Sequence, residues 1–414
     1  MILRKDEEQT TRTQRIVAWV LTLVMIPTLF AFGIYGLATN WENILASVRY
    51  SRSMTYLTNR ENPEFFEMTH ARIQSLESAL GEGIMFKDEL GYGNAFFQKM
   101  LGKKVINAGS HQLYTFDNGQ LYAITTTATL RDEADEVVEF SRKIDGEIPF
   151  LFSYITPQFY EGGDVLPEGY AAVDTGEERA EEVLSIAREA GLETMDSREF
   201  FRDTPYSQNE LYIKTDMHWQ TLAGIEAAKL YAEKISEMTG VELDTSKISM
   251  EQLETEFYPQ KFLGEYGQQV GEMNAGLDDI TLYWPRYETS FVRDSITNRG
   301  TESHTEGSFR DAIIHWDQME GNPSVKAYAA YGLVERFEKI ENLGEDCADL
   351  TVLIYRDSYT APIGTFLSLL VKNVVMVDLR TVSDDAIDYV EKYDPDMVIV
   401  SYSRQMMEDH NYKM

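Results

Sequence analysis

Three side chains in this sequence have the chemistry needed for nucleophilic catalysis. Asp216 and His218 stand one residue apart, where the strand-like run from Leu211 leads into a helix after Trp219. Ser358 follows a second strand-like run, on the turn before another helix, where a serine is well placed as a nucleophile. A serine attacks poorly unless a histidine takes its proton, and that histidine needs a carboxylate to fix its tautomer. These residue types therefore predict a Ser-His-Asp triad.

The same residues have other interpretations. A single histidine is more often structural than catalytic, and Asp216 with His218 could also bind a metal ion. A metal site would need further ligands, and the remaining histidines lack ligand spacing, so we favour the triad. These histidines are His70, His111, His304, His315 and His410. Asp357 precedes the serine, and neighbouring side chains on an extended segment point in opposite directions, so we assign it a structural role in the turn.

The two blocks around these residues resemble the motifs of a known family. Residues 216–219 read Asp-Met-His-Trp, and residues 356–359 read Arg-Asp-Ser-Tyr. They look like the motifs of the DHHW family, the alginate O-acetyltransferase-like branch of the SGNH hydrolase superfamily. The resemblance runs from about Leu76 to the C-terminus, and the two blocks are its specific part. The triad that it implies is Asp216, His218 and Ser358.

Two positions depart from the family pattern. Met217 replaces the first histidine of the DHHW motif, which leaves the triad intact, and Tyr359 stands where the family's late Gly/Arg-Asp-Ser-Phe block has phenylalanine. Arg356 stands where many relatives in the wider superfamily have glycine. The separate glycine and asparagine blocks that supply oxyanion donors in the superfamily cannot be located in this sequence. The backbone N–H of Ser358 is the safest candidate for an oxyanion donor. Arg356, Asn107 and Tyr359 are further candidates for contact with the oxyanion or the substrate.

The apolar pattern predicts the elements that position these blocks. Strand-like and helical segments alternate, which implies a parallel sheet covered by helices on both faces. The resemblance implies the same α/β architecture, an SGNH-hydrolase-like open parallel sheet. In such sheets, sites form beyond the carboxyl ends of the strands, where both catalytic blocks fall. The predicted strands are Pro149–Thr156, Thr351–Tyr355, Val374–Asp378 and Met397–Ser401, and the predicted helices are Asp132–Ile144, Glu177–Ala190, Ala361–Lys372 and Asp384–Lys392.

Two further segments lie outside this alternation. His111–Ile124 predicts a β-hairpin, because Asn-Gly between two apolar runs is typical of a two-residue turn. Residues 240–350 have poor periodicity, which predicts an irregular elaboration inside the domain or a small subdomain. Aromatic residues beside hydrogen-bonding side chains in this segment suit sugar faces, although any single ring is more often part of the core. The sugar-binding candidates are Tyr283, Trp284, Tyr287 and Trp316.

The first hundred residues predict a membrane-anchored stalk. The 23 residues of Ile16–Ala38 carry no charge, and such a run is long enough to span a bilayer and longer than the apolar part of a signal peptide. Basic residues before the run favour a cytoplasmic N-terminus by a small margin. We therefore expect a single-pass cell-membrane protein with a cytoplasmic tail at 1–15, an uncleaved transmembrane anchor at 16–38, a stalk and helical linker at 39–101, and an extracytoplasmic catalytic domain at 102–414.

Charge and cysteine content exclude some functions. The 414 residues carry a formal net charge of −32, and 43% of them are hydrophobic, which is enough for an enzyme-sized core. Nucleic-acid binders concentrate Lys and Arg to release counterions, so we expect no nucleic-acid partner. Cys347 is the single cysteine, which excludes an intrachain disulfide and a thiolate metal cluster and leaves the compartment open.

Together with the resemblance, these features predict an extracytoplasmic O-acetyltransferase that modifies a cell-surface or exported polysaccharide through an acetyl-serine intermediate. Acetyl-CoA is cytoplasmic, and the resemblance implies a polytopic membrane-bound O-acyltransferase as the acetyl donor and no soluble cofactor. Two rival functions stay open. A carbohydrate esterase (deacetylase) would use the same triad with water as the acceptor. A non-catalytic glycan-binding or scaffold component of a polymer-export machine would keep the triad as a relic.

Overall fold

The structure, a computed structural model, describes scattered residues between Trp19 and Trp41 and most of the chain from Lys87 to Met414. The gaps in the second part are 109–110, 117–118, 124–128, 145, 156–174, 203, 299, 333–334, 383 and 410–413. The chain divides into two compact units, Met1–Phe97 and Gln98–Met414. The predicted cytoplasmic tail, much of the predicted anchor and the part of the stalk at 42–86 lie outside the described residues. Among those that are described, no helix combines the length and the apolar character needed to cross a membrane.

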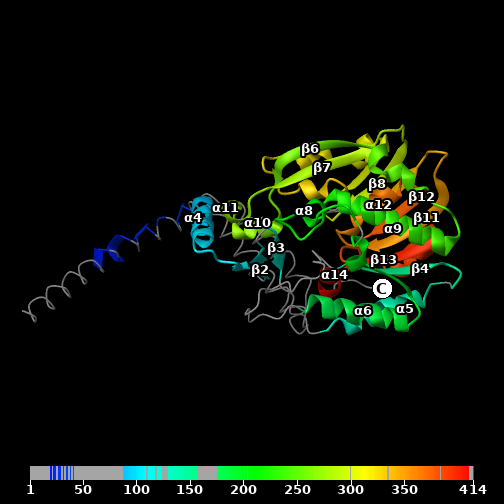
Figure 1. Cartoon of the computed structure of the whole chain (residues 1–414), viewed down its shortest axis with the longest axis horizontal. Helices are drawn as coiled ribbons and strands as arrows, with labels where there is room; N and C mark the ends of the chain where they lie inside the picture. Colours follow the sequence, from blue (N-terminus) through cyan, green and yellow to red (C-terminus); the bar gives the residue numbers. More distant parts are fainter. Residues whose placement is uncertain are drawn as a thin grey trace, which may run out of the picture. The chain divides into compact units, whose positions relative to one another are not determined.

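An eight-stranded sheet forms the centre of the second unit (Figure 1). In order across the sheet, its strands are β5 (Glu193–Asp196), β4 (Phe150–Ile155), β13 (Met397–Ser403), β11 (Ala348–Arg356), β12 (Val371–Val377), β10 (Glu335–Asn342), β8 (Phe291–Thr297) and β9 (Glu302–Gly307). Adjacent strands from β5 to β12 are parallel. The four strands predicted from the sequence correspond to β4, β11, β12 and β13, so the parallel part of the sheet is confirmed.

The other edge of the sheet differs from the prediction. Strand β10 runs antiparallel to β12, and β8 and β9 continue the antiparallel part. All three strands come from the segment predicted to be irregular. Strand β10 shows the reason, because its buried positions include Glu335, Glu338 and Asn342. A strand that buries polar side chains lacks the apolar alternation by which strands are recognised. The sheet is therefore mixed, and the prediction of a wholly parallel sheet is wrong.

Helices cover both faces of the sheet, as predicted (Figure 1). One face is covered by α9 (Thr221–Thr239) and α12 (Thr360–Leu367), and the other by α5 (Arg131–Ser141), α6 (Gly176–Glu189), α13 (Ala386–Tyr393) and α14 (Arg404–Asp409). Strand β11 contributes Val352 and Ile354 to the core on the first side and Leu353 and Tyr355 to the core on the second. This alternation is that of a strand buried on both faces.

The predicted hairpin is present at one end of this unit. Strands β2 (His111–Thr115) and β3 (Leu121–Ala123) pair antiparallel, and β1 (Val105–Ala108) adds to the other side of β2. Gly119, in the turn, has a φ of 87°, a conformation that favours glycine. Helix α4 (Lys87–Met100) precedes this small sheet and is the described part of the predicted linker.

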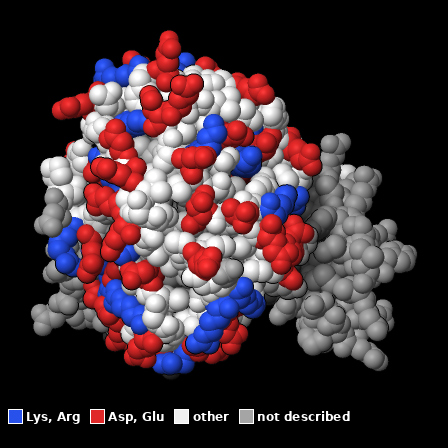
Figure 2. Space-filling view, turned by 90° about the vertical axis from the view of Figure 1, so that its right-hand side faces the viewer, with Lys and Arg blue, Asp and Glu red and all other residues white. Residues whose placement is uncertain are grey.

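The segment predicted to be an elaboration has regular structure of its own. Strands β6 (Leu253–Phe262) and β7 (Asp278–Pro285) form a two-stranded antiparallel sheet. The short helices α10 (Glu265–Val270) and α11 (Glu272–Ala275) lie between them in the chain. Two more short helices, α7 (Ser197–Phe200) and α8 (Gln208–Leu211), precede the catalytic block around His218. On the face shown in Figure 2, acidic side chains are widely spread, with Lys and Arg interspersed.

Candidate active site

Ser358 lies on the turn that joins β11 to α12, at the carboxyl end of a central parallel strand. Its side chain is partly exposed, whereas Asp357 and Tyr359 on either side are buried. The Asp357 carboxylate holds the turn by accepting the N–H of Tyr359 at 3.0 Å and the N–H of Ser403 at 2.6 Å. Within the described residues, no acceptor is bonded to the backbone N–H of Ser358. The turn therefore leaves Ser358 partly exposed, with its backbone N–H unbonded to any described residue.

The Ser358 hydroxyl contacts His218, which comes from a loop 140 residues earlier in the chain. Ser358 Oγ lies 2.7 Å from His218 Nε2, and His218 Nδ1 lies 2.5 Å from Asp216 Oδ1. With its proton on Nδ1, the imidazole donates to Asp216 and accepts the hydroxyl proton of Ser358. The structure thus brings together the three residues that the sequence singled out. Their order is that of a nucleophile, a base and an orienting carboxylate.

Asp216 is buried, and several donors surround its carboxylate. In addition to the imidazole, Oδ1 accepts the backbone N–H of His218 at 3.1 Å, and Oδ2 accepts the backbone N–H of Glu265 at 2.7 Å. Burial by itself would raise the pKa of Asp216, but the neighbouring His218 and these hydrogen bonds outweigh it and lower the pKa below its usual value. The carboxyl group is therefore ionised at neutral pH and stabilises a positive charge on His218.

Residues from the β6–β7 segment hold the loop that carries Asp216. Asp278, at the start of β7, accepts the N–H of Lys214 at 2.8 Å and the N–H and hydroxyl of Thr215 at 2.9 and 2.6 Å. Gly264, just before α10, donates its N–H to Thr215 Oγ1 at 2.7 Å. A Cβ atom on Gly264 would lie 2.4 Å from the Thr215 carbonyl oxygen and 2.5 Å from Asp216 Cβ. This close approach requires glycine, and it packs the catalytic loop directly against α10.

Two tyrosine rings lie against the imidazole of His218. The ring of Tyr328 stacks on it at 4.6 Å between centroids and 21° between planes, and the ring of Tyr359 lies at 5.0 Å. Tyr359 is itself fixed, because its hydroxyl donates to the Met217 carbonyl at 2.6 Å and its own carbonyl accepts Trp219 Nε1–H at 3.0 Å. Burial raises the pKa of Tyr328 to about 12, so its ring is neutral. The two rings fix the imidazole plane and stabilise the cation that forms on it.

Two of the three predicted oxyanion or substrate residues have other roles. Arg356 is fully buried, and its guanidinium donates to the carbonyl oxygens of Gly332 at 2.9 Å and Glu335 at 2.7 Å. The predicted contact of Arg356 with substrate is therefore wrong, because β11 carries this side chain into the protein interior. Tyr359 is buried with its N–H and hydroxyl bonded to protein acceptors, so that prediction is wrong as well. Asn107 lies on β1, but its side chain is outside the described residues.

In the described part of the chain, no three His, Cys, Asp or Glu side chains are grouped so as to hold a metal ion.

The predicted sugar-binding residues are Tyr283, Trp284, Tyr287 and Trp316. They do not adjoin the triad: Trp284 stands six positions along β7 from Asp278, and a strand advances about 3.3 Å per residue, so roughly 20 Å separates them. Tyr283 is buried in the core, so its predicted contact with sugar is wrong. The other three rings are partly exposed. The Arg310 guanidinium covers Trp284 and Trp316 at 5.0 and 4.6 Å from the ring centres.

Sequence reasoning does not identify Gly264, Asp278 or Tyr328 as parts of the site. A glycine outside a periodic segment signals at most a turn or a close backbone approach, without saying to what. The acidic and aromatic residues between 240 and 350 are numerous. Which of them faces the catalytic loop is decided by tertiary packing, which has no local sequence signal.

Comparisons with known proteins give the class of this fold. A family model described as "SGNH hydrolase-like domain, acetyltransferase AlgX" matches residues 164–299, a range that contains Asp216 and His218. The structure is similar to a DHHW family protein from Eubacterium siraeum, with 17% identity, a TM-score of 0.54, and coverage of 75% of this chain and 98% of that chain. It is also similar to Bacillus cereus PatB1 with a sulfonyl adduct, with 17% identity, a TM-score of 0.55, and coverage of 74% and 100%. A search of the curated proteins by sequence gave no match.

These findings define an SGNH hydrolase-like fold. Within that class, the family model confirms the resemblance to the AlgX-like branch, and the DHHW family structure, at 17% identity, shows the same fold.

Proposed function

We propose that the protein is a membrane-anchored, extracytoplasmic O-acetyltransferase that acetylates a cell-surface or exported polysaccharide. The observation that carries the proposal is the unbroken series of contacts from Ser358 through His218 to Asp216. The match to the AlgX acetyltransferase model supports acyl transfer as the class of reaction. The triad gives acyl transfer a nucleophile, a base and a neutralising carboxylate.

Transfer proceeds in two steps. In the first, His218 Nε2 takes the hydroxyl proton of Ser358 while Oγ attacks the acetyl carbonyl carbon of the donor. The bond to the donor's leaving group breaks, and the leaving group takes the proton from His218, which leaves acetyl-Ser358. In the second, a sugar hydroxyl gives its proton to His218 and attacks the same carbonyl carbon, and Ser358 Oγ departs with that proton. Asp216 stabilises the imidazolium in both steps, and the N–H of Ser358 faces the developing oxyanion.

The cellular setting is part of the same proposal. The uncharged run Ile16–Ala38 supports a single-pass anchor in the cell membrane, with the catalytic domain on the extracytoplasmic side. Acetyl-CoA stays in the cytoplasm, so a polytopic membrane-bound O-acyltransferase would deliver the acetyl group across the membrane. Apart from the acetyl donor and the sugar acceptor, the two steps above use only groups of this protein and require no soluble cofactor.

Acylation of Ser358 is the direct test. The full-length protein is mixed with p-nitrophenyl acetate, and the peptide containing Ser358 is examined by mass spectrometry for an acetyl group. We expect labelling of the wild type and none of Ser358→Ala, with His218→Ala strongly slowed. A folded wild-type protein that is never acetylated at Ser358 contradicts the proposal.

The product of the second step separates the proposal from its rivals. A transferase binds a sugar hydroxyl in attacking position, so acetyl should appear on an added oligosaccharide and turnover in water should be slow. Free acetate as the sole product across a broad panel of acceptors identifies an esterase. Glycan binding without any acetylation of Ser358 identifies a scaffold or glycan-binding component.

A further inference from the structure

Two neighbouring hollows lie away from the triad, the larger of them at the far end of β11. Their volumes are about 590 Å3 and about 330 Å3, and Tyr287, Glu288 and Thr289 line both, so we treat the two together as one groove. Cys347 lines the larger hollow and directly precedes β11, whereas Ser358 follows β11. A strand of nine residues is roughly 30 Å long. The groove is therefore separate from the site at which Ser358, His218 and Asp216 meet.

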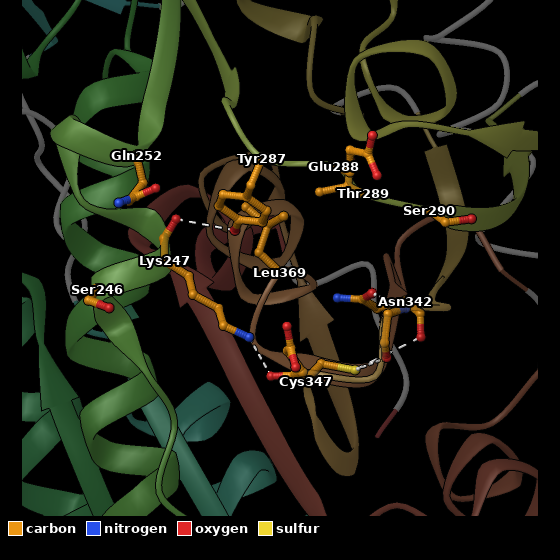
Figure 3. Close-up of a pocket in the computed structure, with 12 residues that line it drawn as sticks. Ser246, Lys247, Gln252, Tyr287, Glu288, Thr289, Ser290, Asn342, Cys347 and Leu369 are labelled. Atoms are coloured by element: carbon orange, nitrogen blue, oxygen red, sulfur yellow. Dashed lines mark hydrogen bonds between the residues drawn. The ribbon is translucent and has the colours of Figure 1, made fainter.

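The larger hollow has polar side chains arranged around an aromatic ring. Figure 3 shows Gln252 and Lys247 on one side and Glu288 and Ser290 on the other, with Tyr287 between them. The side chains of Gln252, Glu288 and Ser290 are exposed and form no hydrogen bond with any described residue. The Tyr287 hydroxyl donates to the Lys247 carbonyl at 3.2 Å. The ring is thereby held in place, while an amide, a carboxylate and a hydroxyl around it stay available to a ligand.

The charges around the hollow disfavour an anionic ligand. Lys247 is the one basic residue that lines the larger hollow, and its ammonium group donates to the backbone carbonyl of Asp346. Arg310 lines the smaller hollow, where its guanidinium lies over the rings of Trp284 and Trp316. The carboxylates of Glu288 and Asp346 are exposed. The protein as a whole carries a net charge of −32, so its field also repels polyanions. A ligand that suits this lining is neutral and forms many hydrogen bonds.

We propose that this groove binds a neutral, hydroxyl-rich saccharide chain. The C–H face of a sugar ring packs on an aromatic ring, and its hydroxyls bond to amide and carboxylate groups, which are the groups present here. The combined volume of the hollows is in the range of ligand sites. The identity of the chain rests on the proposed function: it is the acetyl acceptor, tethered roughly 30 Å from Ser358. Tethering raises the local concentration of acceptor hydroxyls at the triad.

The single cysteine provides a reporter inside the groove. Cys347 is a free, partly exposed thiol, and the sequence contains no other cysteine, so the rate of alkylation by N-ethylmaleimide reports on this place alone. The full-length protein is alkylated with and without cellohexaose, maltohexaose or chitohexaose, and with a polygalacturonate hexasaccharide as the anionic comparison. We expect at least one neutral hexasaccharide to slow alkylation, and the anionic chain to have no effect.

Variants locate the binding. Gln252→Ala and Glu288→Ala remove exposed side chains that form no hydrogen bond or ion pair with a described residue, so the protein should fold normally. Each removes a hydrogen bond worth about 1 kcal/mol, so each should raise the half-protecting concentration about fivefold. Phe257→Ala is the matched control, because this ring is 60% exposed on the adjacent β6 and lines neither hollow. It should leave protection unchanged.

The outcomes separate this inference from the proposed function. It is overturned if no neutral hexasaccharide protects Cys347, if Gln252→Ala and Glu288→Ala leave protection unchanged, or if the anionic chain protects better. Protection combined with no acetylation of Ser358 refutes the acetyltransferase and leaves the groove as a glycan-binding site. Acetylation of Ser358 and of a short acceptor, without protection of Cys347, refutes the groove alone.

Discussion

Replacing Gly264 by alanine tests whether packing against α10 positions the catalytic loop. The added methyl group would lie 2.4 Å from the Thr215 carbonyl oxygen and 2.5 Å from Asp216 Cβ, whereas ordinary contacts begin at 3.4 Å. To lengthen the contact with the Thr215 carbonyl oxygen from 2.4 Å to 3.4 Å, the loop and the start of α10 must separate by about 1 Å. The φ of Gly264 is −67°, which alanine adopts freely, so the clash is the only source of strain. The atoms that clash belong to the backbone or adjoin it, so no side-chain rotation relieves it.

The magnitude follows from this displacement. A catalytic group misplaced by about 1 Å loses roughly 100-fold in rate, or about 2.7 kcal/mol of transition-state stabilisation. The separation also lengthens the hydrogen bonds from Gly264 to Thr215 and from Glu265 to Asp216, which are now both 2.7 Å. Overpacking adds a loss of about 1–3 kcal/mol in the free energy of unfolding.

The assay is the single-turnover rate of acetyl-Ser358 formation from p-nitrophenyl acetate, with a thermal melt of the same samples. Gly146→Ala is the matched control, because a Cβ atom there meets no atom within 4 Å, and we expect wild-type behaviour from it. A Gly264→Ala protein that acylates Ser358 at the wild-type rate would refute the idea that α10 positions the catalytic loop.

Three further predictions concern the same site. In Asp278→Asn, one carboxylate oxygen becomes an amide NH2 group, so two hydrogen-bond donors face each other where the N–H of the catalytic loop was accepted before. The free energy of unfolding should therefore fall by about 1–3 kcal/mol, and an unchanged denaturant midpoint would contradict this. Tyr328→Ala uncovers one face of His218 and should slow acylation of Ser358 roughly 2- to 30-fold, as expected for the loss of a cation–π contact of about 0.5–2 kcal/mol. Tyr328→Phe keeps the ring and should acylate at the wild-type rate. Equal acylation rates for the two variants would exclude a role for the ring. The pKa of Asp216 is lowered in the folded protein, so its stabilising effect is present above the unfolded pKa of about 3.9 and is lost as the pH falls through the folded pKa. The stability difference between the wild type and Asp216→Asn should therefore shrink in acid, and a constant difference from neutral pH to about pH 3 argues against this linkage.

The parallel half of the sheet is predictable from the sequence because its strands are buried on both faces. Strands β11 and β13 read as continuous apolar runs bounded by turns, and the helices between them have apolar stripes. The antiparallel edge is not predictable in this way. Arg293 on β8 lies 3.1 Å from Glu335 and also bonds Glu338, both on β10, so these strands pair around buried charges. Charges in a strand suggest exposure when the sequence is read alone, and only the tertiary partner reverses that interpretation.

The three candidate residues could be singled out from the sequence because each stands at a junction between a strand-like and a helical run and because their two blocks resemble the motifs of the DHHW family. The same adjacency misleads for Arg356, two residues from the nucleophile, because the last residue of β11 points into the interior while the turn points outward. The supports of the triad were not predictable, because the contacts of Gly264 and Asp278 with the loop span about 50 to 60 positions of sequence. Such long-range contacts leave no periodic or motif-like trace.

Strand β7 connects the two sites, and this connection predicts a dependence on acceptor length. Asp278 at its start bonds Thr215 beside Asp216, and Trp284 near its end lines the groove. A saccharide bound in the groove must extend roughly 20–30 Å to reach Ser358, so a short acceptor gains nothing from tethering, whereas a chain that spans the distance presents its hydroxyls at high effective concentration. The rate of transfer from acetyl-Ser358, measured as acetyl appearing on the sugar, should therefore rise steeply once neutral oligosaccharides reach that length. The Gln252→Ala variant should show a smaller rise, with an unchanged rate of Ser358 acylation by p-nitrophenyl acetate. A transfer rate independent of acceptor length would show that acceptors reach the triad directly from solution, and the groove would then have no part in the reaction.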